Sequence, residues 1–198
     1  MAVKKEEVTF VGLKNDIQNL KFAPIYILYG EEAYYIDQLQ DLIINTALAD
    51  DEKDFNLHVH YGVETDVREV INECQRFPMM SERQVVVIRE AQNIDKPELE
   101  LLHYYAERPL DSTVLVVCYK LNRTAGKTDF KATEFMKSVK SCKTGVIFQS
   151  NPLYESGVGQ LIRQFASDGG CNIEPKAVVM LTEHVGTDLS KLVGAVTK

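Results

Sequence analysis

The sequence has no run of apolar residues that approaches the roughly 18 needed to cross a membrane. Residues 1–7 carry four charged side chains and no apolar centre, so we expect no secretory signal there. The cysteines are spread without a CxxC pair, which favours buried thiols over disulfides or a zinc site. They are Cys74, Cys118, Cys142 and Cys171. We therefore expect a cytoplasmic protein without a structural metal.

A phosphate-binding loop is missing where an α/β nucleotide-binding protein would carry it. The apolar run 25–29 predicts the first strand, and GxxxxGK[ST] would have to follow it. Only Gly30 of that pattern is present, and the lysine is absent. Glu31 and Glu32 stand where the phosphates would lie, and their charges oppose phosphate binding. The sequence predicts that no nucleotide or other cofactor binds here.

Two other segments resemble nucleotide-binding motifs without meeting their requirements. Residues 125–128 read Ala-Gly-Lys-Thr, but the first glycine of the motif is replaced by Leu121. At the end of the third apolar run, Arg89 and Glu90 stand where a hydrolytic relative would place two acids. Arg89 thus brings a positive charge to the position of the metal-binding acid. Neither segment predicts catalysis.

The remaining candidates for chemistry also favour structural roles. His58 and His60 alternate along one expected strand and share a face, but the spacing suggests no third metal ligand. Ser81 has no neighbouring His-Asp pair that would mark a nucleophile. We expect no metal site and no intrinsic enzyme activity.

The charge is unevenly distributed along the chain. Hydrophobic residues make up 45% and charged residues 26%, as in a folded globular protein. The net charge of −7 argues against a surface that binds nucleic acid everywhere. Residues 120–143 nevertheless hold seven basic and two acidic side chains, a net +5 that leaves −12 elsewhere. This segment is either a solvated helix face or a contact with DNA or another subunit. Its candidate contact residues are Lys127, Lys131, Lys137 and Lys140.

Five short apolar runs predict buried strands, and helical spacing separates them. The expected strands are 25–29, 55–61, 84–89, 113–118 and 145–148. A helix is expected before the first strand, with Phe10, Leu13, Ile17 and Leu20 on one face. Pro97 fits the start of a later helix and Pro109 its end. Alternating strands and helices predict an α/β domain with a mainly parallel sheet, over residues 1–150.

After residue 150 only helical spacing remains, which predicts a small helical domain over residues 151–198. Three apolar stripes mark the expected helices: Val158, Leu161, Ile162 and Phe165; Val178, Leu181 and Val185; and Leu189, Leu192, Val193 and Val196. The third stripe runs to the last residue without a stop signal, so we expect the natural chain to continue.

An apolar segment, Phe77-Pro78-Met79-Met80, lies between an expected helix and the third strand. Pro78 ends helical geometry. Methionines at an exposed edge suit a partner surface, because the side chain is long and adaptable. Packing of these side chains beneath the sheet is the alternative.

Several segments resemble, in order, the delta subunit family of the bacterial DNA polymerase III clamp loader. FPMMSERQVVVIREAQN resembles its most recognisable stretch, and APIYILYGEEAYYIDQL its degenerate phosphate-loop region. DFNLHVHYG, STVLVVCYKLNR and GTDLSKLVGAVTK resemble its second strand, fourth strand and the last helix of its second domain. Together they span essentially the whole chain.

The resemblance implies an AAA+-like domain with a five-stranded parallel sheet that has lost nucleotide binding. A small helical lid follows, and a collar domain that assembles the loader would lie beyond this chain. Family members bind and open the sliding clamp, the beta subunit, during DNA replication. Carried onto this sequence, the clamp-binding residues are Met79 and Met80, supported by Phe77. The family often has a bulkier aliphatic-aromatic pair at these two positions.

The family also implies partners and a setting. The full-length protein would assemble with the gamma/tau and delta prime subunits, with DNA contact inside the complex. It would have no catalysis of its own, although the holoenzyme is a DNA polymerase, a nucleotidyltransferase. Two alternatives stay open: a nucleotide-dependent AAA+ ATPase, and a stand-alone DNA-binding module that uses residues 120–143.

Overall fold

The computed structural model describes residues 8–122, 129–152, 155–168, 170–185 and 189. The chain divides into two compact units, Met1–Ser150 and Asn151–Lys198. A five-stranded sheet of order β2-β3-β4-β1-β5 forms the centre of the first unit, and every strand pair in it is parallel. The strands are β1 (Ile25–Gly30), β2 (Leu57–Tyr61), β3 (Gln84–Arg89), β4 (Thr113–Lys120) and β5 (Gly145–Ser150).

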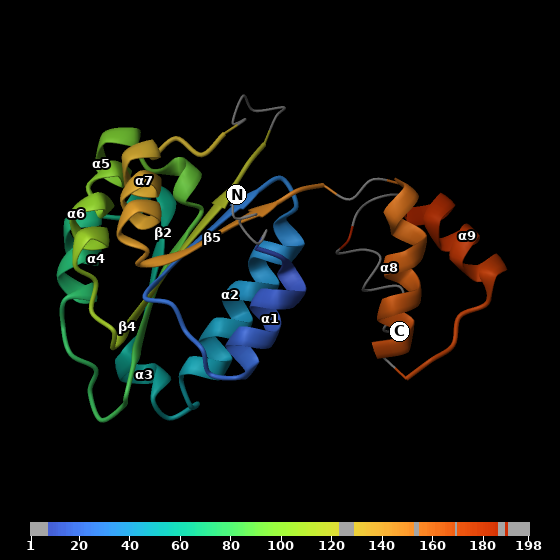
Figure 1. Ribbon diagram of the computed structural model, residues 1–198, viewed down its shortest axis with the longest axis horizontal. Helices are drawn as coiled ribbons and strands as arrows, with labels where there is room; N and C mark the ends of the chain where they lie inside the picture. Colours follow the sequence, from blue (N-terminus) through green and yellow to red (C-terminus); the bar gives the residue numbers. More distant parts are fainter. Residues whose placement is uncertain (1–7, 123–128, 153–154, 169, 186–188, 190–198) are drawn as a thin grey trace, which may run out of the picture. The chain divides into compact units, whose positions relative to one another are not determined.

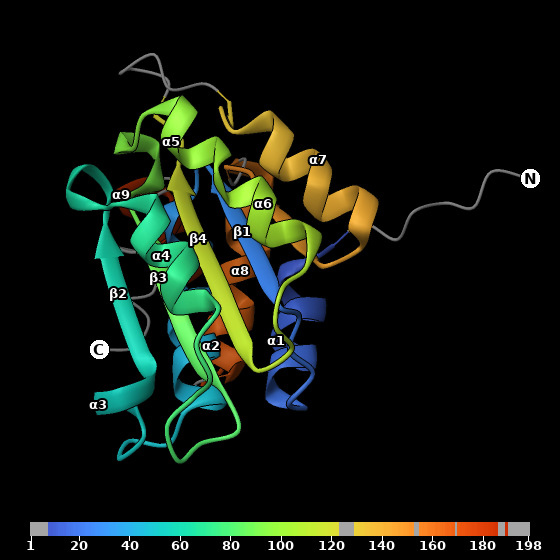
Figure 2. The same cartoon turned by 90° about the vertical axis from the view of Figure 1, so that its left-hand side faces the viewer.

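Helices cover both faces of this sheet (Figures 1 and 2). The helices α1 (Phe10–Gln18) and α2 (Ala33–Ala47) pack on one face. Four helices pack on the other: α4 (Val67–Cys74), α5 (Lys96–Glu100), α6 (Leu102–Glu107) and α7 (Thr133–Cys142). The predicted α/β fold, a five-stranded parallel sheet flanked by helices, is confirmed.

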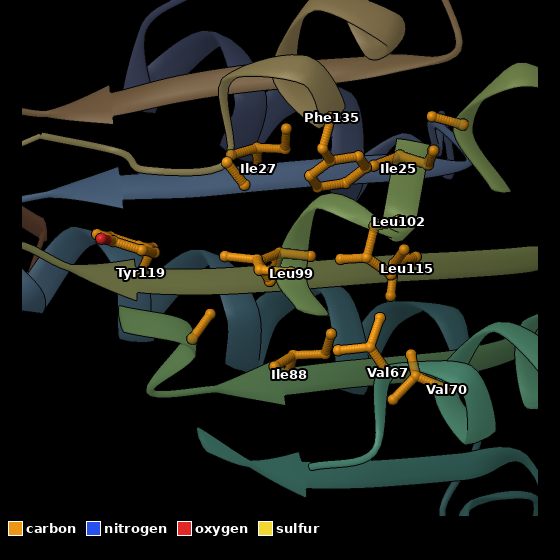
Figure 3. Close-up of a cluster of buried hydrophobic side chains, with 14 of the residues drawn as sticks. Ile25, Ile27, Val67, Val70, Ile88, Leu99, Leu102, Leu115, Tyr119 and Phe135 are labelled. Atoms are coloured by element: carbon orange, nitrogen blue, oxygen red, sulfur yellow. The ribbon is translucent and has the colours of Figure 1, made fainter. Parts of the chain in front are cut away.

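The two cores follow from the alternation of side chains along each strand. Ile25 and Ile27 of β1 face α7, whereas Tyr26 and Leu28 face α1 and α2. Figure 3 shows the first of these cores, where side chains from α4, α5, α6 and α7 meet side chains from β1, β3 and β4. All four residues of the central run 85–88 in β3 are fully buried. A strand buried on both faces has a continuous apolar run in its sequence, which explains why the predicted bounds 84–89 agree with β3.

Local signals set several helix boundaries. Pro97 lies in the first turn of α5, and the helical stretch formed by α5 and α6 ends at Glu107, two residues before Pro109. At α4, the Asp66 side chain accepts a hydrogen bond from the Arg68 amide at 2.8 Å and caps the helix.

The predicted strand 55–61 is wrong at its start. Phe55 and Asn56 belong to a short helix, α3 (Lys53–Asn56), because the amide and side chain of Asn56 both bond the carbonyl of Glu52. The first predicted helix is also shorter than expected. Leu20 lies beyond its end with a φ of 60° and is exposed, while Leu13 and Ile17 are buried as predicted.

Two short 3₁₀ helices also belong to the first unit, η1 (Gly62–Glu64) and η2 (Ala91–Asn93).

In the second unit, α8 (Glu155–Asp168) buries Val158 and Ile162, and α9 (Pro175–Val185) buries Val178. Apart from Leu189, the residues of the third predicted stripe lie outside the described residues. No helix in the described part of the chain is long and apolar enough to span a bilayer.

Candidate functional site

The segment between α4 and β3 places apolar side chains in solvent at the edge where the parallel strands begin. We call residues 77–80 the tip and this side of the sheet its amino edge. Phe77 is 78% exposed, Met79 59% and Met80 101%. Large apolar side chains are rarely left this exposed together, so the tip is a candidate contact surface. The predicted docking residues thus lie together on one loop, and they do not pack beneath the sheet.

The helix that leads to the tip is fixed to the sheet. Val67, Val70 and Cys74 are fully buried in the core, and Ile71 packs against it. This is the helical face that the spacing of apolar residues predicts. The core therefore fixes the orientation of α4 and the position at which the tip begins.

The carboxyl end of α4 is closed by side chains from two strands. The Gln84 side-chain amide donates to the carbonyl oxygens of Glu73 at 2.9 Å and Arg76 at 2.7 Å. The hydroxyl of Thr113 donates to the carbonyl oxygen of Cys74 at 2.9 Å and accepts from Gln84 at 2.8 Å. The last carbonyl groups of a helix have no partner within it, so these bonds stabilise the point where the tip begins.

A second anchor holds the middle of the tip. Asn56, only 1% exposed, accepts a hydrogen bond from the Met79 amide at 2.7 Å and donates one to the Met79 carbonyl at 2.9 Å. The carboxylate of Glu52 accepts hydrogen bonds from the Ala49 amide, at 2.8 Å, and from the side chain of Ser81, just beyond the tip, and both bonds lower the pKa of Glu52. The short helix α3 and Glu52, the residue before it, therefore support the tip. They directly precede β2, the strand next to β3.

Met80 has an unusual backbone conformation. Its φ is 53°, in the left-handed region that residues with a Cβ seldom adopt. The conformation costs about 1–2 kcal/mol for an ordinary residue. It turns the chain sharply between two anchored neighbours and leaves the Met80 side chain entirely in solvent.

At the opposite, carboxyl edge of the sheet, the residues that follow β1 bond the backbone of Ser150. A nucleotide-binding protein would carry its phosphate loop at this position. The amides of Glu31 and Glu32 donate to the carbonyl oxygen of Ser150 at 2.9 and 3.4 Å. The Ser150 hydroxyl donates to the Glu32 carbonyl at 2.7 Å. A Cβ on Gly30 would lie 1.9 Å from that Ser150 oxygen, so the close approach requires glycine. Amides that could otherwise face an anion are thus engaged.

Ion pairs also lie at this edge. Lys120 lies 3.0 Å from a carboxylate oxygen of Asp37 and 3.3 Å from one of Glu90. Burial disfavours its charged form, but the two carboxylates more than offset this and raise the pKa of Lys120. Arg89 donates to the side-chain carbonyl of Gln40 at 2.9 Å. Arg89 stands where a hydrolytic relative would carry a metal-binding acid, and here its side chain forms a hydrogen bond within the protein.

The candidate DNA-contact residues differ in their surroundings. Lys131 donates to the Gln92 carbonyl at 3.0 Å, and Lys137 pairs with Glu134 at 2.7 Å on the exposed surface of α7. Lys140 is exposed on the same helix. Lys127, together with the sequence Ala-Gly-Lys-Thr at 125–128, lies outside the described residues. Of the three described lysines, Lys131 and Lys137 therefore already bond groups of this chain.

The two histidines meet an acid that the sequence spacing does not reveal. His60 Nε2 lies 2.7 Å from a Glu73 carboxylate oxygen, and His58 Nδ1 lies 3.9 Å from the other. The cluster joins β2 to α4. Among the described residues, no group of three or more His, Cys, Asp or Glu side chains could hold a metal ion.

The residues that sequence analysis misses are the polar anchors, Asn56, Gln84 and Thr113. Each is buried and sits within or beside an apolar run, which is the available signal. An uncharged polar residue in such a run needs a buried hydrogen-bond partner. Its partners come from distant segments, so their identity requires the fold.

Comparisons with known proteins identify the family. The model of the family "DNA polymerase III, delta subunit" matches residues 26–144, more than half of the chain. The DNA polymerase III subunit delta of Bacillus subtilis is 30% identical over 102 residues, which cover 48% of this chain and 29% of that protein. The chain thus spans less than a third of this curated relative.

Solved structures show the same fold. The Bacillus subtilis DNA clamp loader delta protein has a TM-score of 0.76 at 21% identity, over 95% of this chain and 56% of that one. A gamma subunit-related protein of DNA polymerase III from Thermotoga maritima has a TM-score of 0.55 at 15% identity, over 96% and 57%. Domain III of the Thermotoga maritima replication initiation protein DnaA has a TM-score of 0.52 at 12% identity, over 96% and 80%. With the family model matching most of the first unit, the chain belongs to the DNA polymerase III delta subunit family.

Proposed function

We propose that this chain binds the DNA polymerase III sliding clamp through its tip and favours the open form of the clamp. The single observation that carries the proposal is the tip itself, whose two methionines are exposed on a loop anchored at both α4 and α3. An apolar anchor held in place before binding loses little conformational entropy on docking. Opening the clamp requires only that the tip bind the open conformation more tightly than the closed one.

The proposal includes the absence of nucleotide binding by this chain. The amides after β1 already donate to Ser150, and Glu31 and Glu32 add negative charge at the same place. Both features oppose a phosphate group. In the complete protein, the same proposal places the chain beside the gamma/tau and delta prime subunits as a non-catalytic component of the replicative polymerase.

DNA contact through the basic segment has weaker support. Lys131 and Lys137 already bond groups of this chain. Binding to DNA alone, with the steep salt dependence of phosphate contacts, would favour that alternative over clamp docking.

Clamp binding by a charged tip variant tests the proposal. Buried apolar anchors often contribute about 2 kcal/mol or more each, so Met79→Asp with Met80→Asp should weaken binding at least about a hundredfold. The melting temperature should stay unchanged, because both side chains are exposed. The control is Val63→Asp, since Val63 is 83% exposed but lies beyond β2 at the carboxyl edge.

The measurement is surface plasmon resonance against the cognate clamp. The control should bind like the wild type. Wild-type affinity in a folded double variant, or equal losses in the double variant and the control, would place the docking surface elsewhere.

A further inference from the structure

Asn56 is the buried polar residue that contacts the tip most directly. It is the last residue of α3, 23 residues before Met79, and directly precedes β2, the strand next to β3. Its side chain makes three hydrogen bonds: one accepted from the Met79 amide, one donated to the Met79 carbonyl and one donated to the Glu52 carbonyl at 3.1 Å. Asn56 thus uses both ends of its amide group on Met79 and also bonds its own helix.

The partners fix the orientation of this side chain. The Met79 amide can only donate, so it must face the Asn56 oxygen, and the Met79 carbonyl can only accept, so it must face the nitrogen. Among the common side chains, only an amide group offers a donor and an acceptor in this paired arrangement. Aspartate keeps the acceptor but, when ionised, loses the donor, and alanine loses both.

These bonds act where the backbone conformation is least favourable. Met79 directly precedes Met80, whose φ of 53° a methionine seldom adopts. A short exposed loop would relax from such a conformation unless its neighbours were held. Pro78 restricts the chain on the other side of Met79. With Met79 fixed at both backbone groups, the turn at Met80 is determined and its side chain projects into solvent.

We propose that Asn56 is the positioning residue of the tip: it holds the Met79 peptide groups so that Met80 is presented in its binding conformation before the clamp arrives. The part concerning the clamp rests on the proposed function, whereas the part concerning tip order does not. A tip that is competent for only a fraction of the time binds with an affinity reduced by that fraction. Loss of Asn56 should therefore weaken binding although Asn56 itself is buried.

Hydrogen exchange tests the tip, and clamp affinity tests its use. In the wild type, the Met79 amide should exchange more slowly than the amide of the fully exposed Met80. Asn56→Ala should speed exchange at Met79 about tenfold or more, since two hydrogen bonds are lost. Protection at Val87 and Val116 in the central strands should be unchanged. Clamp affinity should fall about tenfold or more.

A matched control is Gln92→Ala. Gln92 is also a buried amide, and its side-chain oxygen accepts a hydrogen bond from the Lys120 backbone amide at 3.0 Å, but it lies at the carboxyl edge of the sheet, away from the tip. The control should keep both the exchange rate at Met79 and the clamp affinity. If Asn56→Ala does not fold, Asn56→Ser replaces it, and the wild-type exchange ratio between Met79 and Met80 gives an independent reading.

The outcomes separate the two proposals. Unchanged exchange at Met79 in a folded Asn56 variant would overturn the positioning role. In such a variant, faster exchange at Met79 together with wild-type clamp affinity would overturn the importance of Asn56 for docking. If the wild-type chain does not bind the clamp, the proposed function fails, and the exchange data alone then decide whether Asn56 orders the tip.

Discussion

Replacing Met80 by glycine should separate clamp binding from stability. The side chain is 101% exposed, so its removal gives up no buried surface. Its φ of 53° costs methionine about 1–2 kcal/mol, and glycine adopts this region freely. Glycine also makes the unfolded chain more flexible, which costs about 0.5–1 kcal/mol. We therefore expect the free energy of unfolding to stay constant or to rise by up to about 1.5 kcal/mol.

Binding should change in the opposite direction. Loss of one apolar anchor of about 2 kcal/mol corresponds to roughly thirtyfold weaker clamp binding. Urea denaturation gives the stability and surface plasmon resonance the affinity. Met80→Leu is the control, because it keeps an apolar side chain at the same strained position and should bind within a few fold of wild type. A glycine variant that binds within twofold of wild type, or that loses more than about 1 kcal/mol of stability, would refute the reasoning.

Two further predictions concern the fold. Gly30→Ala should lower the free energy of unfolding by about 2–4 kcal/mol, because the new Cβ would lie 1.9 Å from the Ser150 carbonyl oxygen and φ is 149°; a wild-type urea midpoint would contradict this. The prediction of buried thiols is confirmed for Cys74 and Cys118 but is wrong for Cys142 and Cys171, which are exposed. A thiol reagent at pH 8 should therefore modify Cys142 and Cys171 quickly and the other two cysteines only after unfolding. Burial raises the pKa of the Cys74 thiol, and it raises that of Cys118 to about 12, so neither forms appreciable thiolate at pH 8. Rapid modification of all four thiols would show that the cores open.

The strands could be predicted from sequence because their signal is local. The run 85–88 consists of β-branched residues and is buried on both faces, so composition alone identifies it. Helix ends at Pro97 and Pro109 follow equally from the chemistry of one residue. The error at Phe55 has the same origin. An apolar residue beside a strand resembles part of that strand in the sequence, and the hydrogen bonds that the amides of Phe55 and Asn56 donate to the Glu52 carbonyl assign Phe55 to a helix.

The anchors of the tip could not be predicted in the same way. Asn56 and Met79 are 23 residues apart, and Gln84 reaches Thr113 across 29 residues. Periodicity reports which face of an element is apolar, but it does not report which polar group a distant segment will supply. Pro78 predicts only that the helix ends before the methionines, and the family resemblance predicts that they are exposed. The backbone turn that displays them becomes visible only in the structure.

The carboxyl edge of the sheet shows why charge alone does not explain the expected absence of nucleotide binding. The sequence argument rests on Glu31 and Glu32, and removing their charge should restore binding if that argument were sufficient. The structure adds a second obstacle, since the amides of both residues donate to Ser150, against which Gly30 packs.

We therefore expect no saturable ATP binding by calorimetry for the wild type or for Glu31→Gln with Glu32→Gln, with or without magnesium. Glutamine keeps a side-chain oxygen that can cap α2 as Glu32 does, so the variant should remain folded. Micromolar binding by the wild type would refute the proposal outright. Binding gained only by the double variant would mean that charge is the sole barrier and that the contact with Ser150 gives way to a phosphate.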